Sequence, residues 1–441
     1  MIQVREYAVL TCDSSQTSSM ALGVVSEATF DWLLKLQKTW RKDTALLRLK
    51  SRNSIELGSY VGFLQSPNGE CIEVLPKLQR QRAQEDELAI LRKLLRDMLQ
   101  VSLQLKPRES GAANLQRTDT PLHEWIFTQF LAELATLVKR GLRFDYQRVE
   151  EESRFIRGQL DQNKQSRQMP DRATWFHIRH DIYSPDRVEN RLLRSALNYV
   201  LKLSKTASNW RLANELSHQL ITIEAYRDPL AELPRWQRSK LMQPYNAVRP
   251  WCELILEQLN PNFQKGEHRG IALMFPMERL FENYVEHYLR LSLRPDGRLK
   301  RQASTEYLIN KHQALRGKET AWFQLKPDLI LRTLSATNIS VLDVKWKRLK
   351  SALTSSAQDQ KYGLSQGDLY QLFTYGQKYM NGKGHMMLIF PRCCSFYNAL
   401  PRLSFDDDLH LWLVPFDLDA KKLVGGDWVK KFPGIINVTQ V

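Results

Sequence analysis

Short alternations of hydrophobic and polar residues occupy most of the first eighty positions. IQVREYAVL has the alternation of a strand, and SYVGFLQSPNGECIEVLPK has the pattern of a hairpin closed by its PNG turn. EATFDWLLKLQKTW, from Glu27, has the apolar spacing of a helix. Leucines repeat at helical spacing again across residues 87–103, which places Arg92, Lys93 and Arg96 on the polar face of a second helix. We therefore predict a β-rich N-terminal region.

Longer apolar helices dominate the middle of the chain. The stretches LHEWIFTQFLAELATLVKRGL and ENRLLRSALNYVLKL have helical spacing, and FDYQRVEEESRFIRGQLD between them has the β pattern of an inserted hairpin. The polar segment Arg108 to Pro121 has the composition of a linker, and the charged stretch Lys265 to Arg269 marks a second change of character. We predict a β-rich region in 1–120, a mainly helical region with a hairpin in 121–265, and a third region in 266–441.

Helices and strands alternate in the third region. PMERLFENYVEHYLRL, from Pro276, predicts an amphipathic helix. Strands follow near Lys300 to Ile309, at WFQLKPDLILRT and, after a turn at Thr333 to Asn338, at ISVLDVKW. A helix from about Gly367 to Met380 has Ser365 as its N-cap and Asp368 three residues on, close to a capping box. It precedes two short apolar strands, HMMLIFP and LHLWLVPF. This order predicts a layer with a mixed sheet, so the fold class is α/β in a multidomain chain.

Composition places the chain among ordinary globular proteins. Its 441 residues exceed the length of one typical domain, and 43% hydrophobic and 25% charged residues are ordinary values. No apolar run approaches the ~18 residues that a membrane span needs, and the first residues lack signal-peptide features, so we expect a cytoplasmic protein without a membrane partner. Five cysteines without a CxxC pair indicate neither a disulfide framework nor a zinc ribbon.

The net charge changes this picture most. A formal charge of +16 favours a polyanionic partner, which is either nucleic acid or a membrane surface. Because no basic amphipathic anchor helix is visible, we rank nucleic acid ahead of a membrane.

Two aspartates and a lysine in the third region carry candidate chemistry. Asp328 stands 15 residues before Asp343, and Lys345 follows two positions later in VLDVKWKRLK. Strands joined by a short turn bring the aspartates side by side, and residues two apart in a strand share a face. Carboxylates with substrate phosphate oxygens suit Mg²⁺, and a nearby lysine can orient water and stabilise developing charge. The set predicts metal-dependent phosphodiester cleavage; the alternative is an exposed Asp343–Lys345 ion pair worth about 0 to 1 kcal/mol.

The flanking helices offer further polar groups. Glu278, Glu282 and Glu286 lie on the helix that starts at Pro276, where helical geometry lets either Glu278 or Glu282 reach a metal at the edge of the apolar stripe. A solvated acidic face is the alternative for all three. Gln371 lies one helical turn from Tyr375, and it faces either the strand ends or the solvent.

These stretches together resemble a known nuclease core. PDLIL followed by VLDVKWK, with LFENYV before and DLYQLFTYG after, is similar to the PD-(D/E)XK nuclease superfamily. More narrowly, the chain resembles the McrC family, the endonuclease subunit of McrBC modification-dependent restriction systems. REYA, YVGFLQSPNGECIEVLPK, FIRGQLD and ENRLLRSAL extend the resemblance over nearly the whole chain.

The resemblance implies a role for each matching residue. Asp328 and Asp343 would bind the metal, Lys345 would be the catalytic lysine, Glu282 an accessory metal-site carboxylate and Gln371 a supporting residue. It further implies Mg²⁺ as the cofactor, with Mn²⁺ able to replace it. The substrate would be DNA that carries modified cytosine.

The same resemblance implies a protein partner. This would be an McrB-like AAA+ GTPase that reads modified DNA, with the N-terminal region of this chain docking on its ring and stimulating GTP hydrolysis. The sequence holds no GxxxxGK[ST] phosphate loop, so we expect this chain to bind no nucleotide itself. Two alternatives remain: a non-catalytic basic adaptor that binds nucleic acid and activates an AAA+ NTPase, and a related nuclease with a different motor or an RNA substrate.

Basic residues beside the proposed site have two interpretations. Lys347, Arg348 and Lys350 would either contact backbone phosphates of DNA or form ordinary solvated surface. Trp346 among them either stacks on a base or packs in the core. Structural roles are expected for two further pairs, Arg157-Gly158 and Asn190-Arg191.

Overall fold

The computed structural model describes residues 1–40, 44–78, 84–105, 120–259, 270–313, 319–333, 336–349, 362–436 and 438–439. The chain divides into two compact units. One comprises Met1–Gln104 together with Met274–Val441, and the other comprises Leu105–Leu273. The first and third of the regions expected from sequence therefore contribute to one unit. Most of the expected linker from Arg108 to Pro121, and the charged stretch Lys265 to Arg269, lie outside the described residues.

Two four-stranded sheets and two helices make up the N-terminal part of the first unit. One sheet has the order β3-β2-β5-β4 and the other β1-β7-β6-β11. The strands are β1 Ile2–Arg5, β2 Val9–Thr11, β3 Leu22–Val24, β4 Leu47–Ser51, β5 Ser54–Leu57, β6 Tyr60–Gln65, β7 Cys71–Leu75 and β11 Ile271–Pro276, and the helices are α1 Glu27–Thr39 and α2 Gln84–Ser102.

Two expectations for this part are wrong in detail. IQVREYAVL forms two strands in different sheets, because Tyr7 adopts a left-handed conformation, with φ of 64°, that breaks the extended chain. Arg92 and Arg96 of α2 are buried rather than on a polar face. Arg92 forms a buried ion pair of 2.6 Å with Glu73 of β7. The expected β6–β7 hairpin is confirmed as an antiparallel pair.

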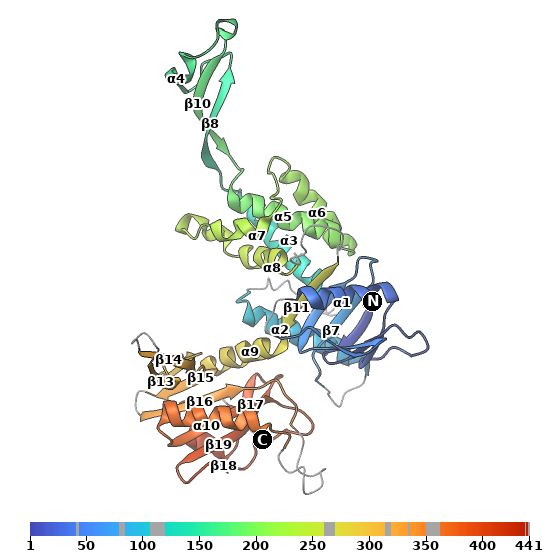
Figure 1. The fold of residues 1–441 in the computed structure, drawn as a ribbon, viewed down its shortest axis with the longest axis vertical. Helices are drawn as coiled ribbons and strands as arrows, with labels where there is room; N and C mark the ends of the chain where they lie inside the picture. Colours follow the sequence, from blue (N-terminus) through green and yellow to red (C-terminus); the bar gives the residue numbers. More distant parts are fainter. Residues whose placement is uncertain are drawn as a thin grey trace. The chain divides into compact units, whose positions relative to one another are not determined.

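The second unit is mainly helical, with an inserted β-ribbon. Its α-helices are α3 Leu122–Arg140, α4 Gln162–Gln165, α5 Val188–Leu203, α6 Ala207–Gln219, α7 Pro229–Glu232 and α8 Arg249–Leu259. Short 3-10 helices span Pro170–Arg172, Leu233–Arg235 and Lys240–Tyr245. The strands are β8 Asp145–Ser153, β9 Gln159–Leu160 and β10 Phe176–Ser184, and Figure 1 shows them extending away from the helices of their unit. We call residues Asp145–Ser184 the ribbon.

Pairing in the ribbon differs from the expected hairpin. β10 lies in the centre and pairs antiparallel with both β8 and β9, so the return strand is Phe176–Ser184 rather than the GQLD stretch. Gly158 has φ of +70°, and a Cβ there would lie 2.3 Å from the Arg179 carbonyl oxygen. Asn190 is fully buried, and its amide donates to the carbonyl oxygens of Arg143 and Pro185. Both residues therefore have structural roles.

A mixed eight-stranded sheet forms the C-terminal part of the first unit. Its order is β12-β15-β16-β17-β19-β20-β21, with β18 paired to β19. The bounds are α9 Met277–Leu291, β12 Gly297–Arg301, β13 Tyr307–Gln313, β14 Glu319–Gln324, β15 Leu329–Thr333, β16 Ala336–Val344, α10 Gln366–Met380, β17 Gly384–Pro391, β18 Leu403–Ser404, β19 Leu409–Asp417, β20 Lys422–Val424, a 3-10 helix Asp427–Lys431 and β21 Val438–Thr439. The chain is thus mixed α/β, as expected.

Two of the expected strands in this region are each divided in two. The stretch near Lys300 to Ile309 supplies β12 to the main sheet and β13 to a separate hairpin with β14. WFQLKPDLILRT likewise supplies β14 and β15, which are separated around Pro327. Proline lacks the N–H group that a ladder requires, so it ends the pairing and lets β15 begin directly after Asp328.

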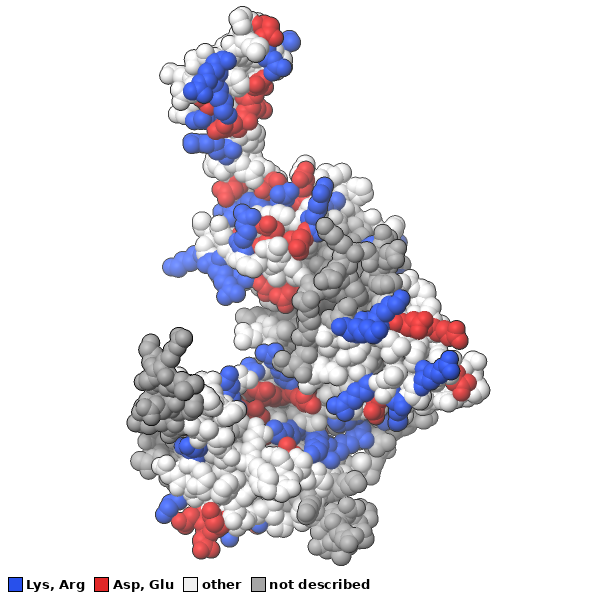
Figure 2. Space-filling view, viewed as in Figure 1, with Lys and Arg blue, Asp and Glu red and all other residues white. Residues whose placement is uncertain are grey.

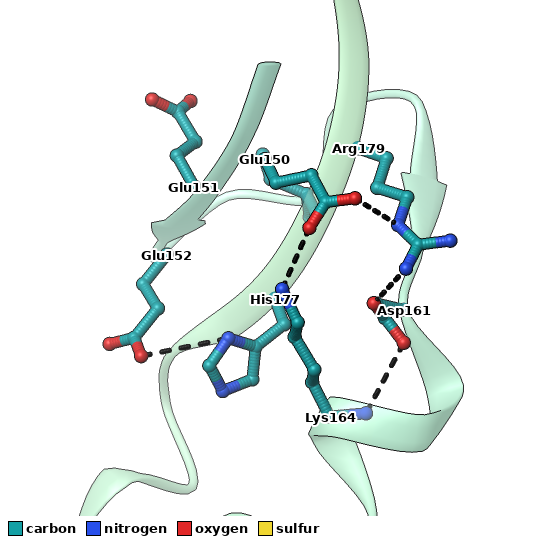
Figure 3. Close-up of a pocket in the computed structure, with 8 residues that line it drawn as sticks. Glu150, Glu151, Glu152, Asp161, Lys164, His177 and Arg179 are labelled. Atoms are coloured by element: carbon teal, nitrogen blue, oxygen red, sulfur yellow. Dashed lines mark hydrogen bonds and ion pairs between the residues drawn. The ribbon is translucent and has the colours of Figure 1, made fainter. Parts of the chain in front are cut away.

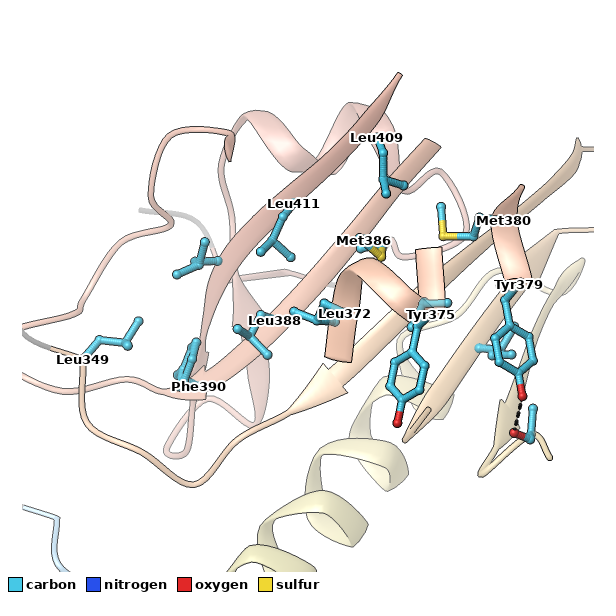
Figure 4. Packing of buried hydrophobic residues seen from close by; sticks show 14 of the residues in the cluster. Leu349, Leu372, Tyr375, Tyr379, Met380, Met386, Leu388, Phe390, Leu409 and Leu411 are labelled. Atoms are coloured by element: carbon cyan, nitrogen blue, oxygen red, sulfur yellow. Dashed lines mark hydrogen bonds between the residues drawn. The ribbon is translucent and has the colours of Figure 1, made fainter. Parts of the chain in front are cut away.

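Helices α9 and α10 cover opposite faces of this sheet. Leu372, Tyr375 and Tyr379 of α10 belong to one core (Figure 4) with side chains of β17 and β19 and with Ile330 and Val341. Phe281 of α9 contacts Trp346 and Phe416 on the other face. Since side chains alternate along a strand, Asp343 shares the face of Val341 and points to the side of α10. Within the described residues, no helix is both long and apolar enough to cross a membrane.

Candidate active site

The two candidate aspartates lie opposite each other on neighbouring strands. β15 and β16 pair antiparallel with Leu329 opposite Leu342, and continuing this register by one residue places Asp328 opposite Asp343. The amide of Val344 donates to Asp328 Oδ2 at 2.8 Å, which fixes the Asp328 side chain against β16. The strand pair therefore brings both carboxylates together, as the sequence spacing predicts.

Asp343 is buried beside Asp328. It is 1% exposed, and its side chain interacts with both Lys345 and Asp328. Its Oδ2 lies 2.9 Å from Lys345 Nζ. The lysine side chain is 27% exposed. Because the Asp343 side chain is 2% exposed, Asp343 and Lys345 do not form the exposed, solvent-screened ion pair that was the alternative interpretation.

Electrostatic repulsion and burial shift the pKa values of this group. Burial, followed by the charges of Asp343 and Glu282, raises the pKa of Asp328 to about 8. Burial also raises the pKa of Asp343, although Lys345 opposes the shift. The pKa of Lys345 is raised because its attraction to Asp343, Asp328 and Asp368 outweighs the effect of burial. Two close buried carboxylates of this kind favour binding of a cation.

Glu282 of α9 lies nearer the centre than Glu278. The Glu282 side chain is 15% exposed, and burial raises its pKa. Its Oε1 lies 3.4 Å from both Arg301 Nη2 and Gln302 Nε2. Glu278 is exposed. Because the Glu282 charge acts on Asp328, the structure favours Glu282 where helical geometry left the choice open.

Asp368 is a further carboxylate beside the centre that the sequence did not indicate as one. Ser365 caps α10 as expected, accepting from the Asp368 amide at 3.2 Å. The Asp368 carboxylate lies 3.4 Å from Lys347 Nζ and acts on both Asp343 and Lys345. The spacing from Ser365 explained Asp368 as a capping residue, and this concealed its position beside the lysines.

Gln371 contacts the centre indirectly. Its side chain is exposed, and Nε2 donates to Tyr375 Oη at 2.7 Å. Tyr375 Oη in turn donates to the Lys326 carbonyl oxygen at 3.2 Å, two residues before Asp328. Burial raises the pKa of Tyr375, and both aspartates act in the same direction. Gln371 thus supports the segment that carries Asp328.

The basic cluster divides into residues with different surroundings. Lys347 is 41% exposed and pairs with Asp368. Arg348 is partly buried, which lowers its pKa. Trp346 is only 4% exposed, so it packs in the core rather than presenting its ring to a base. Lys350 lies outside the described residues. On the face drawn in Figure 2, the basic and acidic side chains of the described residues are interleaved.

A second group of charged residues lines a pocket in the ribbon (Figure 3). Its volume is about 250 Å³, and its lining includes Glu150, Asp161, Lys164, His177 and Arg179. Glu150 lies 2.7 Å from Lys164 and 2.9 Å from Arg179, which also pairs with Asp161. Each carboxylate in these ion pairs has a basic partner, so the group differs from the adjacent aspartates of the candidate active site.

The aspartate pair is chemically suited to a hard cation. Within the described residues, no set of three or more His, Cys, Asp or Glu side chains is placed to hold a metal ion. Mg²⁺, however, usually takes one or two carboxylates and completes its shell with water and phosphate oxygens. The burial of Asp343 and the raised pKa of Asp328 both fit such a site, because a cation would offset the buried negative charge and lower the pKa of Asp328.

A family model and two solved structures are similar to this chain. A family model described as McrBC 5-methylcytosine restriction system component matches residues 55–391. A refined half-complex from a tetradecameric assembly of Thermococcus gammatolerans McrB AAA+ hexamers with bound McrC is 19% identical, with a TM-score of 0.68 over 94% of both chains. A cryo-EM structure of the Thermococcus gammatolerans McrBC complex is 21% identical, covers 66% of this chain and 87% of its own, and has a TM-score of 0.49. No curated protein matches the chain.

Proposed function

The chain belongs to the McrBC 5-methylcytosine restriction system component family, and we propose that it is the endonuclease subunit of such a system. The family expected from the sequence motifs is thereby confirmed. The proposed reaction is hydrolysis of DNA phosphodiester bonds with Mg²⁺, or Mn²⁺ in its place, in a PD-(D/E)XK type of centre.

One observation carries the catalytic part of this proposal. Asp328, Asp343 and Lys345 meet where β15 begins and β16 ends, with both carboxylates at least partly buried and the ammonium 2.9 Å from Asp343 Oδ2. Burying two like charges is costly. A cation and a phosphate group would use all three side chains and offset this cost.

The residues of the centre have separable roles in this proposal. Asp328 and Asp343 would hold Mg²⁺, with Glu282 as an accessory carboxylate. When bound, the cation would supply electrophilic assistance to the phosphate under attack. Lys345 would orient the attacking water and stabilise negative charge on the phosphate as the bridging P–O bond breaks. Tyr375, supported by Gln371, would hold the segment before Asp328. Lys347, Arg348 and Lys350 would contact flanking phosphates.

A partner NTPase is the second part of the proposal. The sequence holds no phosphate loop, and the fold is shared with a chain from an assembly of McrB AAA+ hexamers with bound McrC. We infer that this chain likewise binds an McrB-like AAA+ GTPase and stimulates its hydrolysis. Recognition of the modified base would then lie in the partner.

A cleavage assay with the candidate GTPase tests this function. DNA with and without 5-methylcytosine would be incubated with the full chain, the partner and GTP, in Mg²⁺ or in EDTA. We expect cleavage of the methylated DNA in Mg²⁺, loss of cleavage in EDTA, and loss in an Asp343→Asn variant that still stimulates GTP hydrolysis. Stimulated GTP hydrolysis without cleavage in any condition would instead identify a non-catalytic adaptor.

A further inference from the structure

Segments far apart in the sequence meet at Trp346, the residue after Lys345. The indole Nε1 of Trp346 donates to Glu6 Oε1 at 2.5 Å, across 340 positions of sequence. The carbonyl oxygen of Trp346 accepts from Lys77 Nζ at 3.4 Å. Glu6 follows β1 and Lys77 follows β7. The β1-β7-β6-β11 sheet, which we call the N-terminal sheet, therefore holds both the side chain and the backbone of Trp346.

The buried carboxylate of Glu6 accepts several hydrogen bonds that hold it in place. It is 3% exposed, and its Oε1 also accepts from the Lys77 amide at 3.1 Å, while Oε2 accepts from Ser59 Oγ at 3.4 Å. Burial raises the pKa of Glu6 and lowers that of Lys77, and each charge partly offsets the shift of the other. A buried carboxylate persists only where donors satisfy it, so Glu6 and its donors form a rigid group.

The backbone around Lys345 requires such support. β16 ends at Val344, and the Lys345 amide makes the last ladder-like bond, to the Ile389 carbonyl oxygen at 2.9 Å. The chain then turns, with the Lys347 amide donating to the Lys345 carbonyl oxygen. On its other side the Trp346 ring packs against Phe281, the neighbour of Glu282, at a centroid distance of 5.1 Å. Trp346 is therefore the anchor on the C-terminal side of Lys345.

We propose that Glu6 and Lys77 are positioning residues of the candidate active site, which act through Trp346 to hold the backbone that presents Lys345 to Asp343. The consequence for cleavage rests on the proposed function, whereas the positioning itself does not. The REYA and IEVLPK stretches then have a defined role. The N-terminal sheet is in this account a structural part of the nuclease centre.

Substitutions can separate positioning from general stability. Trp346→Phe keeps a ring against Phe281 and removes the indole donor. Trp428→Phe is the matched control, because Trp428 is fully buried in the same unit and its indole donates to the Val424 carbonyl oxygen at 2.9 Å. Glu6→Ala removes the acceptor. Glu6→Gln keeps the Oε1 acceptor for both Trp346 and Lys77, and its new amide can donate to Ser59 Oγ, whose hydroxyl can reverse.

Hydrogen–deuterium exchange of the full chain measures how firmly the backbone after Lys345 is held, and it does not depend on DNA cleavage. We expect amides in residues 345–349 to exchange at least about threefold faster in Trp346→Phe and Glu6→Ala than in the parent, because local opening becomes easier. Trp428→Phe and Glu6→Gln should leave this segment near the parental rate. In the cleavage assay, kcat should fall by roughly tenfold to a hundredfold for the first two variants with KM for DNA unchanged, as expected for a displaced catalytic group.

The outcomes that contradict the proposal are specific. Equal exchange of residues 345–349 in the two tryptophan variants would overturn it, as would a Glu6→Gln variant as impaired as Glu6→Ala. If Trp346→Phe does not fold, the comparison of Glu6→Ala with Glu6→Gln still tests the proposal. If the parent fails to cleave DNA, or Lys345→Ala cleaves as the parent does, the proposed function fails while the exchange result still decides the positioning role.

Discussion

The surroundings of Asp328 in the candidate active site favour its protonated form. Its pKa rises from an ordinary 3.8 to about 8, first through burial and then through Asp343 and Glu282. A carboxyl whose folded pKa is raised releases its proton more readily in the unfolded chain. The Asp328 carboxyl group therefore lowers the free energy of unfolding more and more as the pH rises from about 4 to 8.

Asp328→Asn should consequently stabilise the protein when no divalent cation is present. Asparagine carries no charge, so it avoids the cost of burying a carboxylate beside Asp343. The midpoint of thermal unfolding in EDTA should rise by roughly a few degrees, more at pH 8 than at pH 5. Differential scanning calorimetry measures this, with Asp408→Asn as a control at a side chain that is 61% exposed.

Adding Mg²⁺ should make the parent more stable to heat than Asp328→Asn. A ligand that binds only the folded state raises its stability, and the parent with both aspartates should gain more than the variant. An Asp328→Asn protein that is less stable than the parent in EDTA would show that the aspartate pair is structural.

Local spacing was sufficient to identify Asp328, Asp343 and Lys345 as neighbours, because strand alternation and a short turn fix their positions. Local spacing was not sufficient for Asp368, since its position three residues after the Ser365 N-cap explained that residue equally well. The contact between Glu6 and Trp346 could not be found at all, because it joins residues 340 positions apart. Contacts of this kind depend on packing between elements, which periodicity does not encode.

Single residues also decide where elements begin and end. The helices at Glu27–Thr39, Met277–Leu291 and Gln366–Met380 follow the expected stretches closely, because apolar periodicity and caps agree there. Expected strands were divided at Tyr7 and near Pro327, where one residue breaks an otherwise continuous β pattern. Short strands carry too few residues for periodicity to reveal such breaks.

Gly158 gives an element-scale prediction for the ribbon. A Cβ at this residue would lie 2.3 Å from the Arg179 carbonyl oxygen and 2.8 Å from His180 Cβ, at a φ of +70°. Gly158→Ala should therefore separate β9 from β10 and cost more than the ~1–2 kcal/mol of left-handed strain alone. Faster amide exchange across residues 159–165 would be the sign of this separation.

Gly141→Ala is the matched control for this change. Gly141 also has a positive φ, of +95°, but a Cβ there would meet nothing within 4 Å. Both variants carry backbone strain, and only Gly158→Ala adds the collision. Equal destabilisation by the two substitutions would contradict the assigned role of Gly158.

At the scale of the whole molecule, the sequence order conceals how the units are composed. Residues Met1–Gln104 and Met274–Val441 form one compact unit, although a separate unit lies between them in sequence. Composition and charge changes mark transitions along the chain but do not show which distant segments fold together. The family match spans residues 55–391 and so includes parts of both units. In our proposals the N-terminal region docks on the partner, and its β1-β7-β6-β11 sheet supports the nuclease centre.

The most direct test of the central claim is the rate of DNA cleavage by Lys345→Ala. Methylated DNA would be cleaved under single-turnover conditions by the full chain with its candidate GTPase partner, GTP and Mg²⁺, and Lys383→Ala would serve as a control at a lysine whose side chain is 76% exposed. We expect the parent and Lys383→Ala to cleave, and Lys345→Ala to be slower by about a hundredfold or more, as loss of a charge-stabilising group requires. Cleavage by Lys345→Ala at the parental rate would contradict the assignment of Asp328, Asp343 and Lys345 as the catalytic centre.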